Sequence, residues 1–315
     1  MFGFGRDPEE AQSDAAAAVA REHGYGGQSM VAPLLRVLVQ APSQPATADD
    51  VTRFRYPKPV DHAATVAEHD ALCQLLESQR IQVVRQPVAE PGNLDAIFVF
   101  DPSIVTDEGV ILCRPGKAVR RPEVDLAAAM YRELEIPVIG TIEEPGTLEG
   151  GDAFWIDANT LAVGEGFRTN RAGIDQLQIY LQPFAIDIVR VPLPYWRGPN
   201  ECLHLLSLIS PVAERKAVAF RPLIATTFVQ LLADLGWELI DVPEEEFATQ
   251  GTNVLALAPG KVVMLNRNPE TRRRLEAAGC EVHVVTGDHM SHNRGGGPTC
   301  LTRPLLRDVS ALNPD

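Results

Sequence analysis

The sequence predicts one α/β domain built as a cyclic or solenoid-like array of similar units. Three observations indicate this architecture. A helical segment followed directly by an apolar strand recurs five times along the chain. Pairs of short apolar segments, joined by turns rich in Asp, Asn, Gly or Pro, stand between these units as expected for β-hairpins. No low-complexity linker divides the chain, so we expect a single domain over residues 1–315.

The N-terminal part of the chain precedes the repeating units. Residues 7–23 are alanine-rich and end at a glycine, which predicts a helix, and residues 1–30 are expected to form a peripheral extension. Residues 37–40 predict the first core strand. The polar, proline-containing stretch 42–59 that follows is of the kind that forms a lid over a site.

The five helix–strand units then follow in order. Helices are predicted at residues 61–78, 122–134, 170–182, 222–236 and 269–279. The strands that directly follow them are predicted at 81–85, 137–140, 186–191, 238–242 and 281–285. Hairpins are predicted from 96–99 with 110–112, 153–156 with 160–163, and 253–258 with 262–265.

The composition narrows the range of functions. Hydrophobic residues make up 45%, mean hydropathy is −0.05, and no apolar run reaches the ~18 residues that a membrane span needs. A net charge of −14 opposes binding to nucleic acid or an acidic membrane, and is compatible with a small cationic substrate. The first residues lack the order of a secretory signal, so a cytoplasmic location is expected. Five scattered cysteines without a C-x-x-C pair indicate free thiols rather than a zinc site.

Two acidic segments carry charge where the surrounding pattern is apolar. Asp95 precedes an apolar stretch and Asp101 ends it. Glu149 and Asp152 flank a double glycine just before the strand at 153–156. Buried carboxylates in such a position need a cationic partner, which a guanidinium ligand provides. A turn opener or a solvated hairpin start is the structural alternative for each.

A histidine and a cysteine complete the candidate site. His204 lies in an apolar run, where a histidine is usually a core residue, yet imidazole is the side chain best suited to proton transfer near neutral pH. Cys300 follows the glycines at 295–297, which let a backbone pass close to a ligand. A cysteine and a histidine from distant segments form the general pair of thiol catalysis, whereas an inert core cysteine is the alternative.

The motifs occur in an order that resembles a known family. They are Phe-Val-x-Asp at 98–101, Arg-Pro-Gly at 114–116, Arg-Arg-x-Glu at 120–123, Leu-Glu-Gly-Gly-Asp at 148–152, Arg-Thr-Asn at 168–170, Leu-His-Leu-x-Ser at 203–207 and Thr-Cys at 299–300. The ordered set resembles the dimethylarginine dimethylaminohydrolase family, within the guanidine-modifying superfamily of arginine deiminases and amidinotransferases. Each motif alone is weak evidence, and the order makes the resemblance specific.

The resemblance implies a fold and a reaction. The fold is the five-bladed, pseudo-symmetric α/β propeller, or pentein fold, with the site on its axis. The reaction is hydrolysis of a guanidine compound through a covalent thiouronium, giving a ureido product such as citrulline and an amine or ammonia, without a cofactor or metal. A homodimer is also compatible with the resemblance. The implied roles are nucleophile for Cys300, acid and base for His204, guanidinium-binding carboxylates for Glu149 and Asp101, a substrate-contacting acid for Asp95, and contacts to the amino-acid end of the substrate for Arg114 and Arg168.

One position departs from the family, and three alternatives stay open. Phe100 stands where dimethylargininases have an acid and arginine deiminases an arginine, so it is expected to shape the substrate pocket and leaves the identity of the guanidine open. An amidinotransferase would resolve the same intermediate with an amine. A catalytically silent member would only bind arginine-like ligands. A metal-binding protein would use His289 and His292.

Overall fold

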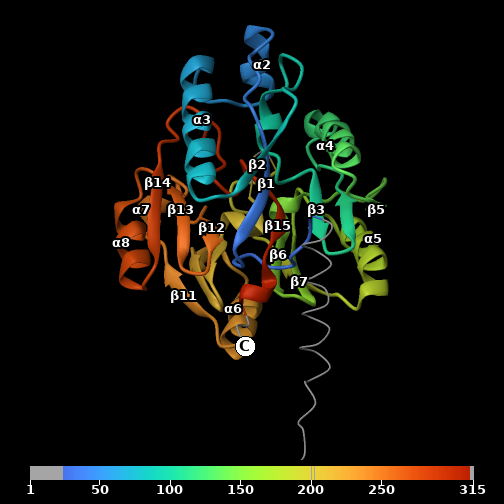
Figure 1. Ribbon diagram of the computed structural model, residues 1–315, viewed down its shortest axis with the longest axis vertical. Coiled ribbons are helices and arrows are strands. Elements are labelled where there is room, and N and C mark those ends of the chain that lie inside the picture. The colour runs from blue at the N-terminus through green and yellow to red at the C-terminus, as the bar shows by residue number, and fades with distance from the viewer. Residues whose placement is uncertain (1–23, 200, 202, 313–315) are drawn as a thin grey trace, which may run out of the picture.

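The computed structural model describes residues 24–199, 201 and 203–312, and it contains five three-stranded sheets (Figure 1). Four of the sheets are contiguous in sequence. They consist of β3 (Ser103–Thr106), β4 (Gly109–Leu112) and β5 (Val138–Thr141); β6 (Ala153–Asp157), β7 (Thr160–Glu165) and β8 (Asp187–Pro192); β9 (Ile209–Ala213), β10 (Lys216–Ala219) and β11 (Glu238–Asp241); and β12 (Leu255–Ala258), β13 (Lys261–Leu265) and β14 (Glu281–Val285).

Each of these sheets has the same construction. An antiparallel hairpin comes first, and its second strand pairs in parallel with the strand that follows a helix. A parallel pair needs such a crossover, because the chain must return to the end where it started. The crossover helices of the four sheets are α4 (Pro122–Glu133), α5 (Arg171–Leu181), α6 (Thr226–Asp234) and α8 (Pro269–Ala277).

The fifth sheet joins the two ends of the described chain. β15 (Arg303–Arg307) pairs antiparallel with β1 (Leu34–Gln40), and β1 pairs in parallel with β2 (Gln82–Gln86) after the helix α3 (His62–Ser78). In Figure 1 these strands lie between the sheet of β12–β14 and that of β3–β5. The array is therefore closed, which confirms the predicted five-bladed α/β propeller.

Two predicted elements differ in the structure. Residues 96–99 do not form a strand, because residues 94–97 are a 3₁₀ helix and β3 begins only at Ser103. A short buried apolar run does not distinguish a strand from a helical turn. The hairpin of β9 and β10 was not anticipated. The predicted helix at 222–236 starts at Thr226, after a separate 3₁₀ turn at 221–223.

The stretch 42–59 is partly helical, and part of the expected N-terminal extension joins the closing sheet. Residues 42–59 contain the short helix α2 (Ala48–Arg53), and a second short helix, α7 (Glu244–Phe247), follows β11. Residues 1–23 lie outside the described residues. Residues 24–30 are not peripheral, because Gly26 donates to Leu305 O and accepts from Arg307 N, at 2.7 and 2.9 Å. These bonds make that part of the expected extension an edge of the closing sheet.

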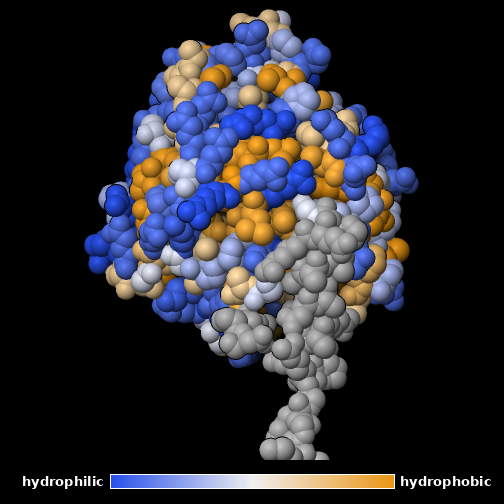
Figure 2. Space-filling model, viewed as in Figure 1, coloured by the Kyte–Doolittle hydropathy of each residue, from blue (hydrophilic) through white to orange (hydrophobic). Residues whose placement is uncertain are grey.

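Hydrophilic and apolar side chains are distributed between surface and core as expected for a folded domain. Figure 2 shows hydrophilic side chains over most of one face and hydrophobic ones gathered near its middle, in the region of β1 and β15. Buried apolar side chains form several clusters, such as the one in which Leu72 and Leu76 of α3 pack on Val263 and Leu265 of β13. No helix of the described part is long and apolar enough to cross a membrane.

Candidate active site

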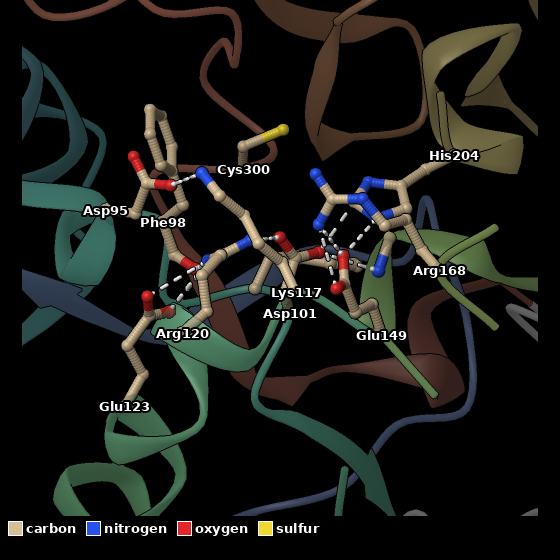
Figure 3. A network of polar contacts seen from close by, with 12 residues as sticks. Asp95, Phe98, Asp101, Lys117, Arg120, Glu123, Glu149, Arg168, His204 and Cys300 are labelled. Atoms are coloured by element: carbon tan, nitrogen blue, oxygen red, sulfur yellow. Dashed lines mark hydrogen bonds and ion pairs between the residues drawn. The ribbon is translucent and has the colours of Figure 1, made fainter. Parts of the chain in front are cut away.

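The five sheets contribute side chains from one equivalent position. The segment just before the first strand of each hairpin carries a polar or reactive residue: Asp101 before β3, Glu149 before β6, His204 before β9, Asn253 before β12 and Cys300 before β15. The pseudo-symmetry of the fold thus directs residues that are far apart in sequence to one end of the axis. Figure 3 shows Asp101, Glu149, His204 and Cys300 around a common network of polar contacts.

His204 lies between two carboxylates. Its Nε2 is 2.6 Å from Glu149 Oε2, and its Nδ1 is 3.8 Å from Asp101 Oδ1. The side chains of all three residues are buried. Negative charge on both sides of the ring favours the doubly protonated imidazolium. Gly151 makes this approach possible, because a Cβ there would lie 2.5 Å from His204 Nδ1.

Glu149 is fully buried and holds a guanidinium of the protein. Arg168 Nη1 lies 2.9 and 3.1 Å from its two carboxylate oxygens, and the Gly116 amide donates to Oε1 at 3.0 Å. Burial alone would raise the pKa of Glu149, but Arg168 and then His204 hold that pKa well below its usual value. Glu149 is therefore an ionised acceptor that binds an imidazole and a guanidinium at once.

Asp101 has an analogous partner in Arg120. Arg120 Nη1 lies 2.6 Å from Asp101 Oδ2, and the same guanidinium pairs with Glu123 through Nε and Nη2. The Gly151 amide donates to Asp101 Oδ1 at 3.0 Å. Burial raises the pKa of Glu123 to about 7, although Arg120 opposes that rise. Arg120 thereby fixes Asp101 from the side away from His204.

Asp152 supports the histidine segment from behind. It accepts hydrogen bonds from Leu205 N at 2.9 Å and from Thr169 Oγ1 at 2.6 Å. Burial raises the pKa of Asp152 to about 6, while the charge of His204 and these hydrogen bonds limit the rise. The carboxylate ties the loops before β6 and β9 together, which positions His204 against Glu149.

Cys300 is half-buried and has a hydrogen-bond donor directed at its sulfur. Asn253 Nδ2 lies 3.2 Å from Sγ, and Asn253 Oδ1 accepts from Thr299 N at 3.1 Å. No local sequence pattern marks Asn253, but its equivalent position before the hairpin of β12 and β13 would have revealed it. Gly296 has a φ of 146°, and a Cβ there would lie 2.5 Å from the Phe98 ring, so glycine is required for the close approach of this loop.

Asp95 lies in a separate ion cluster beside Cys300 (Figure 3). Arg294 binds it through two bonds of 2.8 and 2.7 Å, and Lys117 Nζ lies 3.1 Å from Oδ2. Burial would raise the pKa of Asp95, but Arg294 above all holds it below its usual value. The loop at 116–117 spans the site, since its Gly116 amide binds Glu149 and its Lys117 side chain reaches Asp95.

Two expected substrate contacts lie apart from this network. Arg114 donates to Gly146 O at 3.1 Å and pairs with Glu144 at 2.8 Å near the surface. The Phe100 ring packs in the core beneath the guanidinium of Arg303, whose carbon is 3.6 Å from the ring centroid. Both residues lie in the turn at 99–102, in which the Phe100 ring faces Arg303 while the Asp101 carboxylate faces His204. Beside Arg168, a pocket of about 300 Å³ is bordered by Phe167, Leu193 and Tyr195.

A metal is a poor match for these donors. Among the described residues, the one group of three or more acidic, histidine or cysteine ligand atoms within 4.8 Å of one another is that of Asp101, Glu149 and His204. Its two carboxylates already bind the guanidinium groups of Arg120 and Arg168. His289 and His292 do not belong to this group, and His292 Nε2 lies 3.2 Å from Asn266 Oδ1. The donor set is suited to guanidinium cations.

Comparison with known proteins agrees with this chemistry. The family model described as arginine deiminase matches residues 93–229 and 210–307. The dimethylarginine dimethylaminohydrolase of Streptomyces coelicolor is 29% identical, over 80% of this chain and 90% of its own length. An arginine deiminase of Listeria welshimeri is 28% identical over 67% of this chain, and the match spans only 61% of that longer enzyme.

Solved structures share the fold. DDAH from Pseudomonas aeruginosa in complex with citrulline has a TM-score of 0.69 and 23% identity, over 86% of this chain and 98% of that one. An amidinotransferase from Microseira wollei has a TM-score of 0.74 and 17% identity, over 90% and 97% of the two chains. At these identities the likeness establishes the five-bladed architecture of the chain.

Proposed function

The chain belongs to the arginine deiminase family, and from this premise we propose that it is a cysteine-dependent hydrolase of a small guanidine compound. One observation carries the proposal. The protein's own Arg168 guanidinium lies on Glu149, which also contacts His204 at 2.6 Å. The site therefore already holds a planar N–H cation in the position that a guanidine substrate requires. The named relatives, a dimethylargininase and arginine deiminases, support a substrate of the arginine class.

Binding of the substrate requires an exchange of guanidinium groups. Glu149 and Asp101 present carboxylate oxygens on either side of the His204 ring. Paired N–H bonds to such oxygens are strong and fix the plane of the guanidinium carbon. Arg168 occupies part of this space, so it has to move towards the neighbouring pocket or share Glu149 when substrate enters. In its displaced position, Arg168 is placed to meet an anionic end of the substrate.

The first half of the reaction forms a covalent bond to Cys300. The guanidinium carbon is a poor electrophile because its charge is delocalised, so the attacking group must be a thiolate. The amide donor of Asn253 at 3.2 Å and the bound cation stabilise negative charge on Sγ. Attack gives a tetrahedral adduct, His204 donates its proton to the departing nitrogen, and the C–N bond breaks. The products are a free amine or ammonia and a thiouronium on Cys300.

The second half releases the product by hydrolysis. Neutral His204 takes a proton from water, and the resulting hydroxide adds to the thiouronium carbon. Collapse of this adduct breaks the C–S bond and releases the proton of its hydroxyl group to solvent, which frees the Cys300 thiolate and a neutral ureido product. His204 ends protonated again, so the cycle closes. General acid and base help of this kind is worth roughly 10²–10⁴-fold in rate.

A substrate screen tests this proposal. Arginine, methylated arginines, agmatine and guanidino acids are incubated with the protein, and ureido product, ammonia and amines are measured beside the Cys300→Ala variant. We expect ureido product from at least one compound with the unaltered protein and none with the variant. Transfer of the amidino group to an added amine, without ureido product, would identify an amidinotransferase instead. Lack of turnover with every compound would overturn the proposal.

A further inference from the structure

The pocket beside Arg168 has the size and the walls of a small-molecule site. Its volume of about 300 Å³ is at the lower end of the range for such sites. Its apolar lining comes from two segments that follow strands of one sheet, with Phe167 after β7, and Leu193, Pro194, Tyr195 and Trp196 after β8. None of these apolar side chains takes part in the proposed reaction.

Two aromatic rings on the walls of this pocket are exposed to solvent. Phe167 is 50% and Tyr195 is 72% exposed, and the two rings contact each other edge to face at a centroid distance of 5.7 Å. Single exposed apolar side chains are common on protein surfaces. Two exposed rings that meet in a pocket beside a catalytic carboxylate instead form an apolar surface that a ligand would cover. The pair therefore indicates a ligand with an apolar part.

The turn that carries Tyr195 is fixed by several contacts. Trp196 has a φ of 44°, which is uncommon for a bulky residue, and its ring packs on Phe247 at a centroid distance of 5.8 Å. Gly198 donates from its amide to Tyr195 O at 2.7 Å, and a Cβ at Gly198 would lie 2.9 Å from Tyr195 Oη. A left-handed backbone at a bulky residue persists only where its surroundings hold it. The aromatic wall is therefore in place before a ligand binds.

The pocket lies one side chain away from the catalytic carboxylate. Arg168 lines the pocket, and its Nη1 is 2.9 Å from Glu149 Oε1 (Figure 3). Gly116 fixes this spacing, because its amide donates to Glu149 at 3.0 Å and a Cβ on it would lie 2.7 Å from Arg168 O. Leu203, which also lines the pocket, directly precedes His204. A guanidinium bound to Glu149 can therefore reach the pocket through a chain of about three methylene groups, as in the arginine side chain itself.

We propose that this pocket, here called the aromatic pocket, binds an aryl group at the far end of the guanidine substrate. The inference rests on the proposed function, because it requires Glu149 to bind the guanidinium of the substrate. An aryl ring packs against Phe167 and Tyr195, and aromatic contacts of this kind add to the free energy of burial. When substrate displaces Arg168 from Glu149, its guanidinium meets the negatively polarised face of the same ring.

The amino-acid end of free arginine is the competing occupant of the aromatic pocket. Glu201, which also lines it, would pair with an α-ammonium group, and Arg168 with an α-carboxylate. Glu201 is exposed, however, so such a pair would contribute little. Arg114, the second arginine expected at that end of the substrate, instead donates to Gly146 O at 3.1 Å and pairs with Glu144 at 2.8 Å. The lining therefore favours an apolar group over a zwitterion.

Binding to the Cys300→Ala variant tests the aromatic pocket without any turnover. Calorimetry gives the Kd of 3-phenylpropylguanidine, of propylguanidine, which lacks the ring, and of arginine. We expect the phenyl compound to bind at least about tenfold more tightly than propylguanidine, because the ring leaves water, and also more tightly than arginine. Equal affinities of the two guanidines, no binding of either, or tighter binding of arginine would overturn the inference. Hydrolysis of these compounds by the unaltered protein is a separate result, which tests the proposed function.

Variants of the two exposed rings then locate the aryl group. Phe167→Ala and Tyr195→Ala, each combined with Cys300→Ala, should reduce the preference for the phenyl compound to about threefold or less. Because both rings are exposed, the Tm of these variants should change little. Ile179→Ala, at a position of α5 that is 65% exposed and outside the pocket, is the matched control and should retain the preference. A preference that persists in both ring variants would place the aryl group elsewhere and would also overturn the inference.

Discussion

Two buried regions of this protein carry charge, and they are balanced in different ways. In the candidate active site, two buried arginines face carboxylates: Arg168 faces Glu149, and Arg120 faces Asp101 and Glu123. On β15, the contacts of the buried Arg303 and Arg307 guanidinium groups among the described residues are with backbone carbonyls and an aromatic ring. The Phe100–Asp101 peptide separates the two regions. Carboxylates that already bind guanidinium groups are suited to exchange them for a guanidine substrate, whereas guanidinium groups held by carbonyls and a ring have a structural role.

The largest expected effect is a loss of turnover that leaves the buried ion pairs in place. Cys300 lies beside the ion network, and its Sγ accepts a hydrogen bond from Asn253 Nδ2. We expect Cys300→Ala to reduce turnover by about 10⁴-fold or more, because no other group is placed to attack the guanidinium carbon. The Tm should change little. Cys280→Ala, at a buried position in a different sheet, is the matched control and should retain full kcat. Substantial turnover by Cys300→Ala would contradict the assignment.

The next prediction compares the two regions directly. Glu149→Gln leaves Arg168 and His204 without their shared anion, and breaking a buried pair typically costs about 3–5 kcal/mol of unfolding free energy. Arg303→Met instead removes a guanidinium that forms no ion pair with a carboxylate among the described residues, so the loss should be about 1 kcal/mol or less. Urea unfolding of both variants measures the difference. Equal losses would show that the two regions do not differ as described.

A smaller effect is expected at Asn253. The Asn253→Ala variant loses the amide donor on Cys300 Sγ, and a hydrogen bond to a charged group is worth about 1.5–3 kcal/mol, or roughly 10–150-fold in rate. The pH profile of thiol alkylation should move to higher pH, because the thiolate has lost a donor. The exposed Asn159→Ala variant serves as the control. A lower rate with an unchanged alkylation profile would indicate that Asn253 acts only through Thr299.

A further prediction concerns the pH dependence of stability and Asp152. Burial raises the pKa of this carboxyl from 3.8 to about 6 in the folded protein. Between these values the unfolded chain has released the proton while the folded chain retains it, so stability falls as pH rises. Relative to Asp152→Asn, the unfolding free energy of the unaltered protein should fall by about 2 kcal/mol between pH 4 and pH 6. A constant difference across this range would contradict the raised pKa.

Much of the fold follows from local patterns in the sequence. Helices α3, α4, α5 and α8 and the strands after them appear where apolar periodicity predicts them. The strand predicted at 96–99 is absent because residues 94–97 form a buried 3₁₀ turn, which has the same apolar signature as a buried strand. The pairing of β15 with β1 joins segments at opposite ends of the chain, and no local pattern encodes such a contact.

The residue types of the candidate site were predictable from the sequence, but the contacts between their side chains were not. The ordered motifs identified Glu149, His204 and Cys300, and the structure brings Glu149 and His204 into direct contact. They did not indicate that Arg168 lies on Glu149, or that Arg294 and Lys117 bind Asp95. These contacts depend on which way each side chain turns from its loop. The unpaired state of Arg303 and Arg307 depends on what other sheets place opposite them, so it too required the assembled fold.

The most direct test of the central claim uses a cation that carries its own reactive carbon. 2-Chloroacetamidine presents amidinium N–H groups to carboxylates, whereas chloroacetamide is a neutral analogue of nearly the same shape. Each reagent is incubated with the protein, and the alkylated cysteine is identified by peptide mass spectrometry. The arrangement of Glu149, Asp101 and Cys300 predicts rapid alkylation of Cys300 by the amidine alone, slowed in Glu149→Gln. Equal rates for the two reagents, or alkylation chiefly at another cysteine, would contradict it.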